Sequence, residues 1–338
     1  MKGFNLKFTL VFTLIFVLTM VSMVNAQEKP EFYMVTHGLP TNTYWGAVYN
    51  GWMDACEIFG VKGTYVGAVN IDDPLESIGN LEAVTAKKPD GIAVCIDDPF
   101  MFDKSVRFAI GQGIPVVATN IRDPRSDDER IPYLVYIGEN SYQMGVVEAK
   151  GVLNKFVEIY GRVPKRVIFL NHAPGILCLT ERAAGAKDVC DKMGVANYDV
   201  VPTKGDPAEI HETVRAYVQK YPDTEAVLTG WSQVAVWSTQ ALRELGKLGN
   251  RNEPAKEGNV YVGGIDVDAE CLQLILDGDI ILTVDQQPYL QGFLAVVVLY
   301  NWDKYKLSPF GAINTGPLVI DPSNAEEMIE LAKKGIRG

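Results

Sequence analysis

The stretch that decides the fold reads Asp90-Gly-Ile-Ala-Val-Cys-Ile-Asp-Asp-Pro-Phe100 and, after a segment of helical length, Gly113-Ile-Pro-Val-Val-Ala-Thr-Asn120. Both parts hold an apolar run of strand length. Each run leads directly into a polar cluster, Asp97-Asp98 in the first part and Thr119-Asn120 in the second. In an open parallel sheet, ligands bind in the crevice outside the carboxyl ends of the strands. The two segments therefore predict a site for a small polar molecule at such a sheet edge.

The same alternation of apolar strands and amphipathic helices continues along the chain after Gln27. Strands that alternate with helices form parallel sheets with helices on both faces. No Pro- or Ser-rich linker separates the two halves of the pattern, which argues against domains on a flexible tether. The fold class is therefore α/β, with two similar doubly wound parallel-sheet lobes joined by a hinge of crossing strands. We expect strands at 32–36, 64–68, 91–95, 115–119, 133–137, 166–170, 197–202, 225–229, 259–264 and 280–284, and helices at about 44–60, 75–87, 101–112, 142–159, 179–193, 207–220, 232–246 and 288–303.

The first residues of the chain predict export. Lysines precede an apolar run at 8–24, and small residues lead up to Ala26. This pattern is typical of a cleaved secretory signal peptide. An uncleaved membrane anchor is the alternative, because the run is near the lower length limit for a spanning helix. The small residues favour cleavage, so we expect residues 1–26 to be a signal peptide and the mature chain to be periplasmic.

Composition narrows the class of protein further. The remaining 312 residues exceed the usual size of one hydrophobic core, which favours two lobes. Without Lys2 and Lys7 the formal charge falls from −11 to −13, so we expect no nucleic-acid partner. An odd, scattered set of cysteines predicts small buried side chains rather than a disulfide framework. These cysteines are Cys56, Cys95, Cys178, Cys190 and Cys271.

The sequence shows no pattern for cofactor binding or covalent catalysis. Gly111-Gln-Gly113 is followed by Ile-Pro, which breaks a dinucleotide fingerprint. His37, His172 and His211 are far apart in sequence, whereas a zinc or iron site needs a denser set of ligands. Gly230-Trp-Ser-Gln-Val234 has the place of a nucleophile elbow but not its second small residue, and no His follows it. We therefore predict no cofactor, no metal and no enzymatic activity.

Polar and aromatic residues follow many of the predicted strands. Each has an ordinary explanation alone, such as Asp98 or Asp266 as a helix cap, but their number favours a binding site. A sugar or polyol has hydroxyls that donate and accept, and C–H faces on which aromatic rings stack. Buried carboxylates and amides that pair with each hydroxyl make such a site selective. The expected contacts are His37, Asn42, Tyr44, Trp45, Asp97, Asp98, Asn120, Trp231, Asp266 and Gln286.

Several short motifs occur in a fixed order along the mature chain. They are Asn42-Thr-Tyr-Trp-Gly46, Lys88-Pro-Asp-Gly-Ile92, Asp98-Pro99, Gly113-Ile-Pro-Val-Val117, Tyr136-Ile-Gly-Glu-Asn140 leading to Gly145, Gly264-Ile-Asp266 and Gln286-Gln-Pro-Tyr289. Their order and spacing resemble the periplasmic sugar-binding proteins of the ribose/galactose/glucose-xylose type, the solute receptors of ABC importers. The resemblance covers essentially the whole mature chain. It implies the type I periplasmic binding fold, which holds a ligand between lobes that close about a hinge.

The resemblance also implies where the lobes divide. Residues 135–138 are similar to the crossover into the second lobe, and residues 283–286 to the crossover back. The expected domains are 27–137 plus 285–313 for the N-terminal lobe and 138–284 plus 314–338 for the C-terminal lobe.

Four of the expected contacts match the pocket of the family. Tyr44 and Trp45 correspond to its paired aromatics, Asp266 to an acid that binds sugar hydroxyls, and Gln286 to an amide of the hinge strand.

Other positions depart from the family pattern. Asn120-Ile121 replaces the Asp-Arg pair of ribose-type relatives, Thr180 stands in place of a ligand-binding Arg, and Trp231 replaces a small polar residue. We include Thr180 among the expected contacts. The pocket loses charged donors and gains aromatic surface, which argues against ribose and galactose. Glucose, xylose, inositol and other polyols remain candidate ligands.

The resemblance implies a secreted, monomeric receptor that captures a neutral monosaccharide or polyol and delivers it to the permease of an ABC importer. The alternative is a receptor on the same fold that reports a furanosyl autoinducer or a chemotactic sugar. A DNA-binding regulator with this fold needs an N-terminal helix-turn-helix, and the predicted signal peptide occupies that place.

Overall fold

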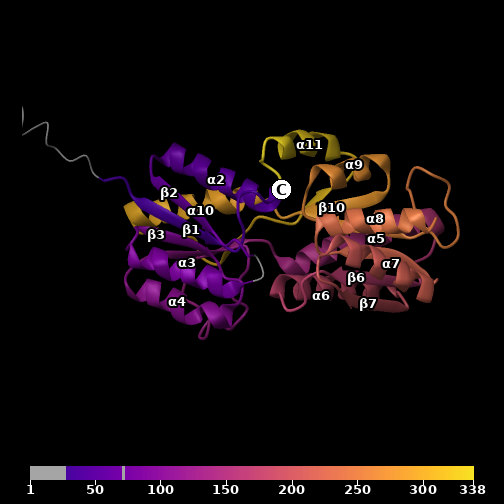
Figure 1. The fold of residues 1–338 in the computed structure, drawn as a ribbon, viewed down its shortest axis with the longest axis horizontal. Helices are drawn as coiled ribbons and strands as arrows, with labels where there is room; N and C mark the ends of the chain where they lie inside the picture. Colours follow the sequence, from indigo (N-terminus) through magenta and orange to yellow (C-terminus); the bar gives the residue numbers. More distant parts are fainter. Residues whose placement is uncertain (1–27, 71–72) are drawn as a thin grey trace, which may run out of the picture.

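The computed structural model describes residues 28–70 and 73–338, which form two α/β lobes side by side along the long axis of the molecule (Figure 1). Each lobe is built around a six-stranded sheet, which confirms the predicted fold class. Within these residues, every helix is too short or too polar to span a bilayer. The predicted signal peptide lies outside the described residues and stays a prediction.

The sheet of the first lobe has the strand order β11-β5-β4-β3-β1-β2, and all of its neighbouring strands pair in parallel. Its inner strands β3 and β4 are buried along their whole length, as expected for parallel strands covered on both faces. The strands are β1 (Glu31–Thr36), β2 (Lys62–Gly67), β3 (Gly91–Cys95), β4 (Val116–Thr119), β5 (Tyr136–Gly138) and β11 (Ala312–Asn314).

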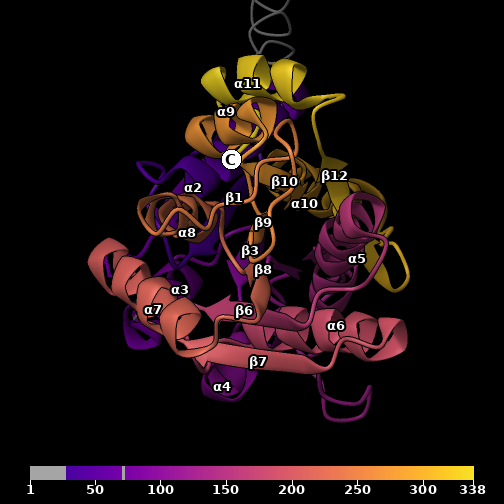
Figure 2. The same cartoon turned by 90° about the vertical axis from the view of Figure 1, so that its right-hand side faces the viewer.

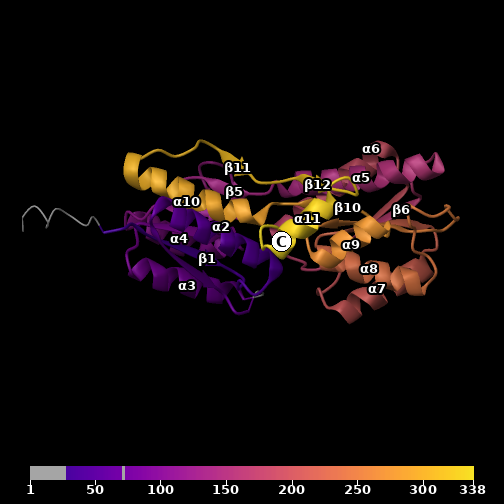
Figure 3. The same cartoon turned by 90° about the horizontal axis from the view of Figure 1, so that it is seen from above.

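Two helices cover each face of this sheet. α2 (Thr43–Phe59) and α10 (Pro288–Tyr305) pack together on one face (Figure 3). α3 (Pro74–Ala86) and α4 (Pro99–Gly111) cover the other. The contact between α2 and α10 depends on glycine, because a Cβ on Gly51 or Gly292 would lie 2.0 Å from a backbone oxygen of the facing helix. α10, the last helix of the first lobe, thus packs closely on α2, its first helix, although the two are far apart in sequence.

The sheet of the second lobe has the order β12-β10-β9-β8-β6-β7, and only β12 runs antiparallel to its neighbour. Helices α5 and α6 cover one face of this sheet, and α7, α8 and α9 the other (Figure 2). The elements are β6 (Arg166–Asn171), β7 (Asn197–Pro202), β8 (Thr224–Thr229), β9 (Tyr261–Ile265), β10 (Ile280–Asp285), β12 (Leu318–Ile320), α5 (Ser141–Tyr160), α6 (Leu177–Met193), α7 (Pro207–Lys220), α8 (Ser232–Glu244) and α9 (Ala269–Asp277).

The chain passes between the lobes three times. It leaves the first sheet after β5, returns after β10, and crosses again between β11 and β12. The last helix, α11 (Ala325–Lys333), packs on α9, and Arg337 beyond it pairs with Asp285 at the end of β10. These crossings bring the two sheets together, and the exact residue boundaries of the lobes stay a prediction.

The expected helices and strands coincide with the observed ones to within about three residues. The expected strand at 133–137 begins only at Tyr136, although Leu134 already donates to the Val116 carbonyl at 2.8 Å. The short helices α9 and α11, of nine residues each, and the three-residue strands β11 and β12 were not expected from the sequence, because they are shorter than typical helices and strands. The five cysteines are free, and all but the half-buried Cys178 are buried.

Glu148 on α5 is a buried carboxyl that links this helix to the second sheet. Its Oε1 accepts a hydrogen bond from the Thr229 backbone N–H at 2.7 Å. Burial raises the pKa of Glu148 to about 8, although the Thr229 N–H and the charge of Arg182 act in the opposite direction. The folded chain therefore holds a proton that the unfolded chain releases near the ordinary pKa of 4.5, and the free energy of unfolding falls as the pH rises from there to about 8.

We expect Glu148→Gln to flatten this loss of stability, because glutamine keeps the acceptor and removes the titration. The group contributes a slope of up to about 1.4 kcal/mol per pH unit. Urea unfolding between about pH 5 and pH 8 measures it. Glu158→Gln, an exposed position on the same helix, is the control and should keep the wild-type slope. An unchanged slope in Glu148→Gln contradicts the assignment.

Candidate ligand-binding cleft

A cavity of about 400 Å³ lies between the two lobes. This volume is within the range of roughly 300–1,000 Å³ for small-molecule sites. Much of its lining follows directly on strands of both sheets, as at His37 after β1, Asn120 after β4, His172 after β6 and Asp266 after β9. The carboxyl ends of the parallel strands in both sheets therefore face one cleft, as the sequence predicted for one sheet edge.

The cleft brings together most of the residues expected from the sequence. Those that line it are His37, Asn42, Tyr44, Trp45, Asn120, Trp231, Asp266 and Gln286. Their contact with a ligand stays a prediction.

Three expected residues do not line the cleft. Asp97 is paired with His37, which does line the cleft. Asp98 caps α4, where its carboxylate accepts from the N–H groups of Phe100 and Met101, so its helix-cap explanation accounts for it. Thr180 is exposed on α6, and its hydroxyl lies 3.4 Å from the Ile176 carbonyl oxygen.

The N-terminus of α2 positions the aromatic wall of the first lobe. Asn42 caps this helix by accepting from the N–H groups of Tyr44 and Trp45. The Trp45 ring packs edge-on against both His37 and Tyr44, at centroid distances of 4.7 and 5.0 Å. A Cβ on Gly38 would lie 2.1 Å from the Trp45 ring, so only glycine lets the loop after β1 close over it. The aromatic pair is thus held rigidly at the cleft.

Gln286 connects the two lobes at the centre of the cleft. Its Nε2 donates to Asp266 Oδ1 at 2.6 Å, and its Oε1 lies 3.0 Å from the Tyr44 hydroxyl. That hydroxyl also accepts from Asn120 Nδ2 at 2.7 Å and lies 3.0 Å from Gln291 Oε1. A continuous polar network therefore runs from the first lobe, through the crossover after β10, to the second lobe.

Asp266 is the titratable group of this network. Burial raises its pKa to about 7, while the charge of Arg182 and the hydrogen bond from Gln286 counteract this rise. Near neutral pH its carboxyl is therefore present in both protonation states. Such a group can donate to one ligand hydroxyl or accept from another.

The cleft also contains an ion pair between Arg182 and Glu139, which the sequence did not lead us to expect. The guanidinium binds both carboxylate oxygens, at 3.0 and 2.6 Å, and donates to the Gly230 carbonyl at 2.7 Å. Both side chains are buried at the cleft. Glu139 follows β5 directly, so the strand-end rule that found the other residues would also have found it.

Other lining residues were missed as well, and all but Ile121 belong to the second lobe. His172 follows β6 and lies beside Trp231, with ring centroids 5.5 Å apart. Burial lowers its pKa to about 4, with a further lowering by Arg182, so its imidazole is neutral at pH 7. The remaining missed lining residues are Ile121, Ala173, Ile176, Cys178, Leu179, Lys204, Gly205 and Gly230.

Among the described residues, one group of side chains has the spacing of metal ligands. It consists of His37, Cys95 and Asp97. We predicted no metal site because the histidines are far apart in sequence. That argument did not consider a cysteine at the end of a neighbouring strand and an aspartate just after it.

The fold and the cleft define a two-lobed solute-binding protein. The chain belongs to the family of the periplasmic binding protein domain, whose sequence profile matches residues 32–303. It is 30% identical over 267 residues to a xylose/arabinose-binding protein of Sulfolobus acidocaldarius. That match covers 77% of this chain, which spans 63% of the relative's length.

Solved structures show the same architecture. A carbohydrate transporter from Acidothermus cellulolyticus 11B in complex with myo-inositol superimposes with a TM-score of 0.74 at 25% identity, over 91% of this chain and 100% of that one. A periplasmic sugar-binding protein of an ABC sugar transporter from Legionella pneumophila gives 0.74 at 26% identity, over 85% and 100%. The resemblance to sugar-binding proteins of ABC importers is therefore confirmed, and the matched proteins are named as binding or transport proteins rather than enzymes.

Arg182→Met should lower the free energy of unfolding by about 3–5 kcal/mol, because it leaves the Glu139 carboxylate buried without a partner. Adding Glu139→Gln should recover most of this loss. The exposed pair of Arg122 with Glu181 is the matched control, and Arg122→Met should cost under about 1 kcal/mol. Urea unfolding of these three variants and the wild type measures this, and equal losses in Arg182→Met and Arg122→Met would refute the assignment.

Proposed function

We propose that the mature chain is a periplasmic receptor that captures a neutral monosaccharide or polyol in its cleft and delivers it to an ABC permease. The observation that carries this proposal is the network of Tyr44, Gln286 and Asp266, which presents alternating donors and acceptors between aromatic walls. Hydroxyls bind to such donors and acceptors in pairs, and an aromatic face packs on the C–H groups of a sugar ring.

The charges at the cleft support a neutral ligand. Arg182 is already bound to both oxygens of Glu139 and to a backbone carbonyl. Its guanidinium is thus engaged and does not serve as a counter-ion for a ligand carboxylate. Lys204 lines the cleft but is exposed.

The relatives support the same class of ligand. One is named as a xylose/arabinose-binding protein, and one solved structure holds myo-inositol. A pentose, a hexose or a cyclic polyol therefore belongs to the ligand class that we propose for this chain.

Capture in a cleft between lobes implies closure about the crossovers. Gln286 belongs to one of these crossovers and binds groups of both lobes. A ligand that replaces or extends its contacts favours one arrangement of the lobes over another. In the closed arrangement, the two lobes form the surface that the monomeric receptor presents to its permease. The protein itself makes and breaks no covalent bonds.

A thermal-shift screen against pentoses, hexoses, inositols and signal furanoses tests the proposal. A ligand of the folded state raises the melting temperature by mass action. We expect at least one neutral sugar or polyol to do so. The absence of any shift with these compounds would rule the proposal out, and a shift with signal furanoses alone would favour the signal receptor.

For the ligand found in this screen, Asp266→Ala should weaken binding at least tenfold, equivalent to about 1.4 kcal/mol. The affinity falls because the ligand loses the buried carboxyl group that pairs with one of its hydroxyls. Thr180→Val is the control and should leave the affinity unchanged, because this side chain does not line the cleft. Calorimetric titration measures both, and unchanged affinity in Asp266→Ala would place the ligand elsewhere.

A further inference from the structure

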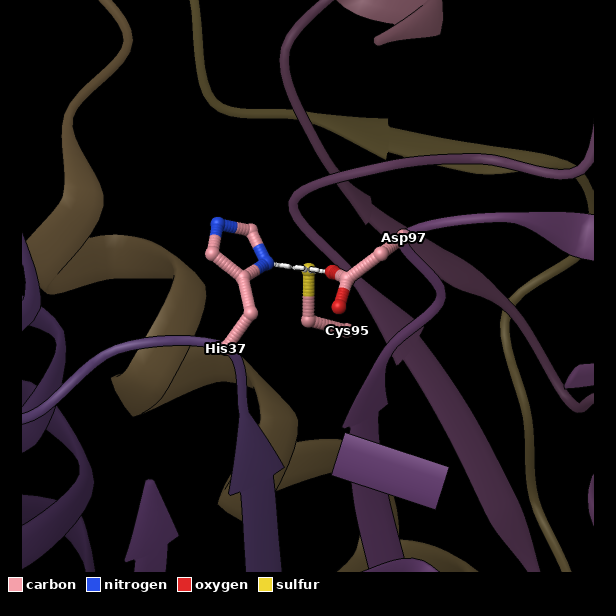
Figure 4. Close-up of side chains that lie close together, drawn as sticks. All are labelled: His37, Cys95 and Asp97. Carbon is pink, nitrogen blue, oxygen red and sulfur yellow. Dashed lines mark hydrogen bonds and ion pairs between the residues drawn. The ribbon is translucent and has the colours of Figure 1, made fainter. Parts of the chain in front are cut away.

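Three side chains of the first lobe converge on one another, and one of them, His37, lines the cleft (Figure 4). His37 Nδ1, Cys95 Sγ and Asp97 Oδ1 all lie within 4.8 Å of one another. The sulfur is 3.2 Å from the imidazole nitrogen and 3.1 Å from the carboxylate oxygen, and those two atoms also pair directly. Three different donor atoms therefore surround one point.

The ends of two neighbouring strands bring these donors together, with Cys95 in the sheet and His37 and Asp97 in the bends that follow the strands. His37 follows β1 directly, Cys95 is the last residue of β3, and the two strands are neighbours. Asp97 comes two residues after Cys95, and its Oδ1 accepts from the Cys95 thiol at 3.1 Å. Cys95 anchors the group in the core of the lobe, where it is only 1% exposed, while His37 and Asp97 are half-buried.

The arrangement differs from that of a nucleophilic triad. A triad needs the nucleophile on one imidazole nitrogen and the carboxylate on the other. Here both Cys95 and Asp97 approach Nδ1 of His37. Convergence of sulfur, nitrogen and oxygen on a single point is instead the geometry of a metal site.

The donor set selects the class of metal. A thiolate, an imidazole and a carboxylate are the ligands of Zn²⁺, at about 2.0–2.3 Å. Three protein ligands leave a fourth position, as in open zinc sites. His37 lines the cleft, and the carboxamide oxygen of Asn120, another lining residue, is 3.5 Å from the Cys95 sulfur. The fourth position thus lies toward the ligand cavity.

We propose that His37, Cys95 and Asp97 form a binding site for a divalent metal of the zinc class at the wall of the cleft, with one coordination position facing the cavity. A water or a hydroxyl of a cleft ligand completes the coordination. Without the ion the same groups form a hydrogen-bonded cluster, in which the thiol and the imidazole both contact the Asp97 carboxylate.

Cobalt titration of the tag-free mature chain, stripped with a chelator, tests this site. Co²⁺ reports a thiolate ligand through a charge-transfer band in the near ultraviolet. We expect one equivalent of Co²⁺ to produce the band and Zn²⁺ to abolish it. Cys95→Ser should remove the band, and Cys190→Ser, a buried thiol in the core of the second lobe, should keep it.

His37→Gln provides a second variant that retains the thiol, and it should weaken cobalt binding at least tenfold. Absence of the band in the wild-type chain, its persistence in Cys95→Ser, or unchanged affinity in His37→Gln would overturn the proposal. The titration uses the metal alone, so its failure leaves the proposed sugar binding untouched. Failure of the sugar screen likewise leaves the metal site standing.

Discussion

The three passages of the chain between the lobes are the constraint on which the rest of the structure depends. Because the chain leaves each sheet at a strand end and enters the other lobe, the carboxyl ends of both sheets face the same cavity. Polar residues that follow the strands are then collected from distant parts of the sequence. The crossings of the chain that form the hinge therefore also bring the lining residues of the cleft together.

Gln286 shows how the hinge and the site are joined. It lies in the crossover after β10, is nearly inaccessible to solvent, and binds Asp266 of one lobe and the Tyr44 hydroxyl of the other. An unpaired buried carboxamide is costly, so its partners restrict how the lobes sit. Since the pKa of Asp266 is about 7, the protonation state of this network changes near neutral pH. The arrangement of the lobes and the charge of Asp266 are therefore coupled through one side chain.

The fold could be predicted from the sequence because strand and helix periods alternate regularly, and the strand-end rule located Asn120, Asp266 and Gln286. The contacts between side chains far apart in sequence could not be predicted in this way. Arg182 meets Glu139 only after α6 packs on α5 beside the crossover. The group of His37 with Cys95 and Asp97 depends on β1 and β3 being neighbours, which spacing along the chain does not reveal. Strand order and side-chain pairing are the information that the structure adds.

The central claim is that a neutral sugar or polyol binds between the lobes on the network around Gln286. The most direct measurement is a crystal structure of the mature chain with the compound that stabilises it most. The account predicts a ring in the cleft, with hydroxyls within hydrogen-bond distance of Asp266 and Gln286. A ring bound outside the cleft, or a cleft in which these two side chains contact only each other, would contradict it.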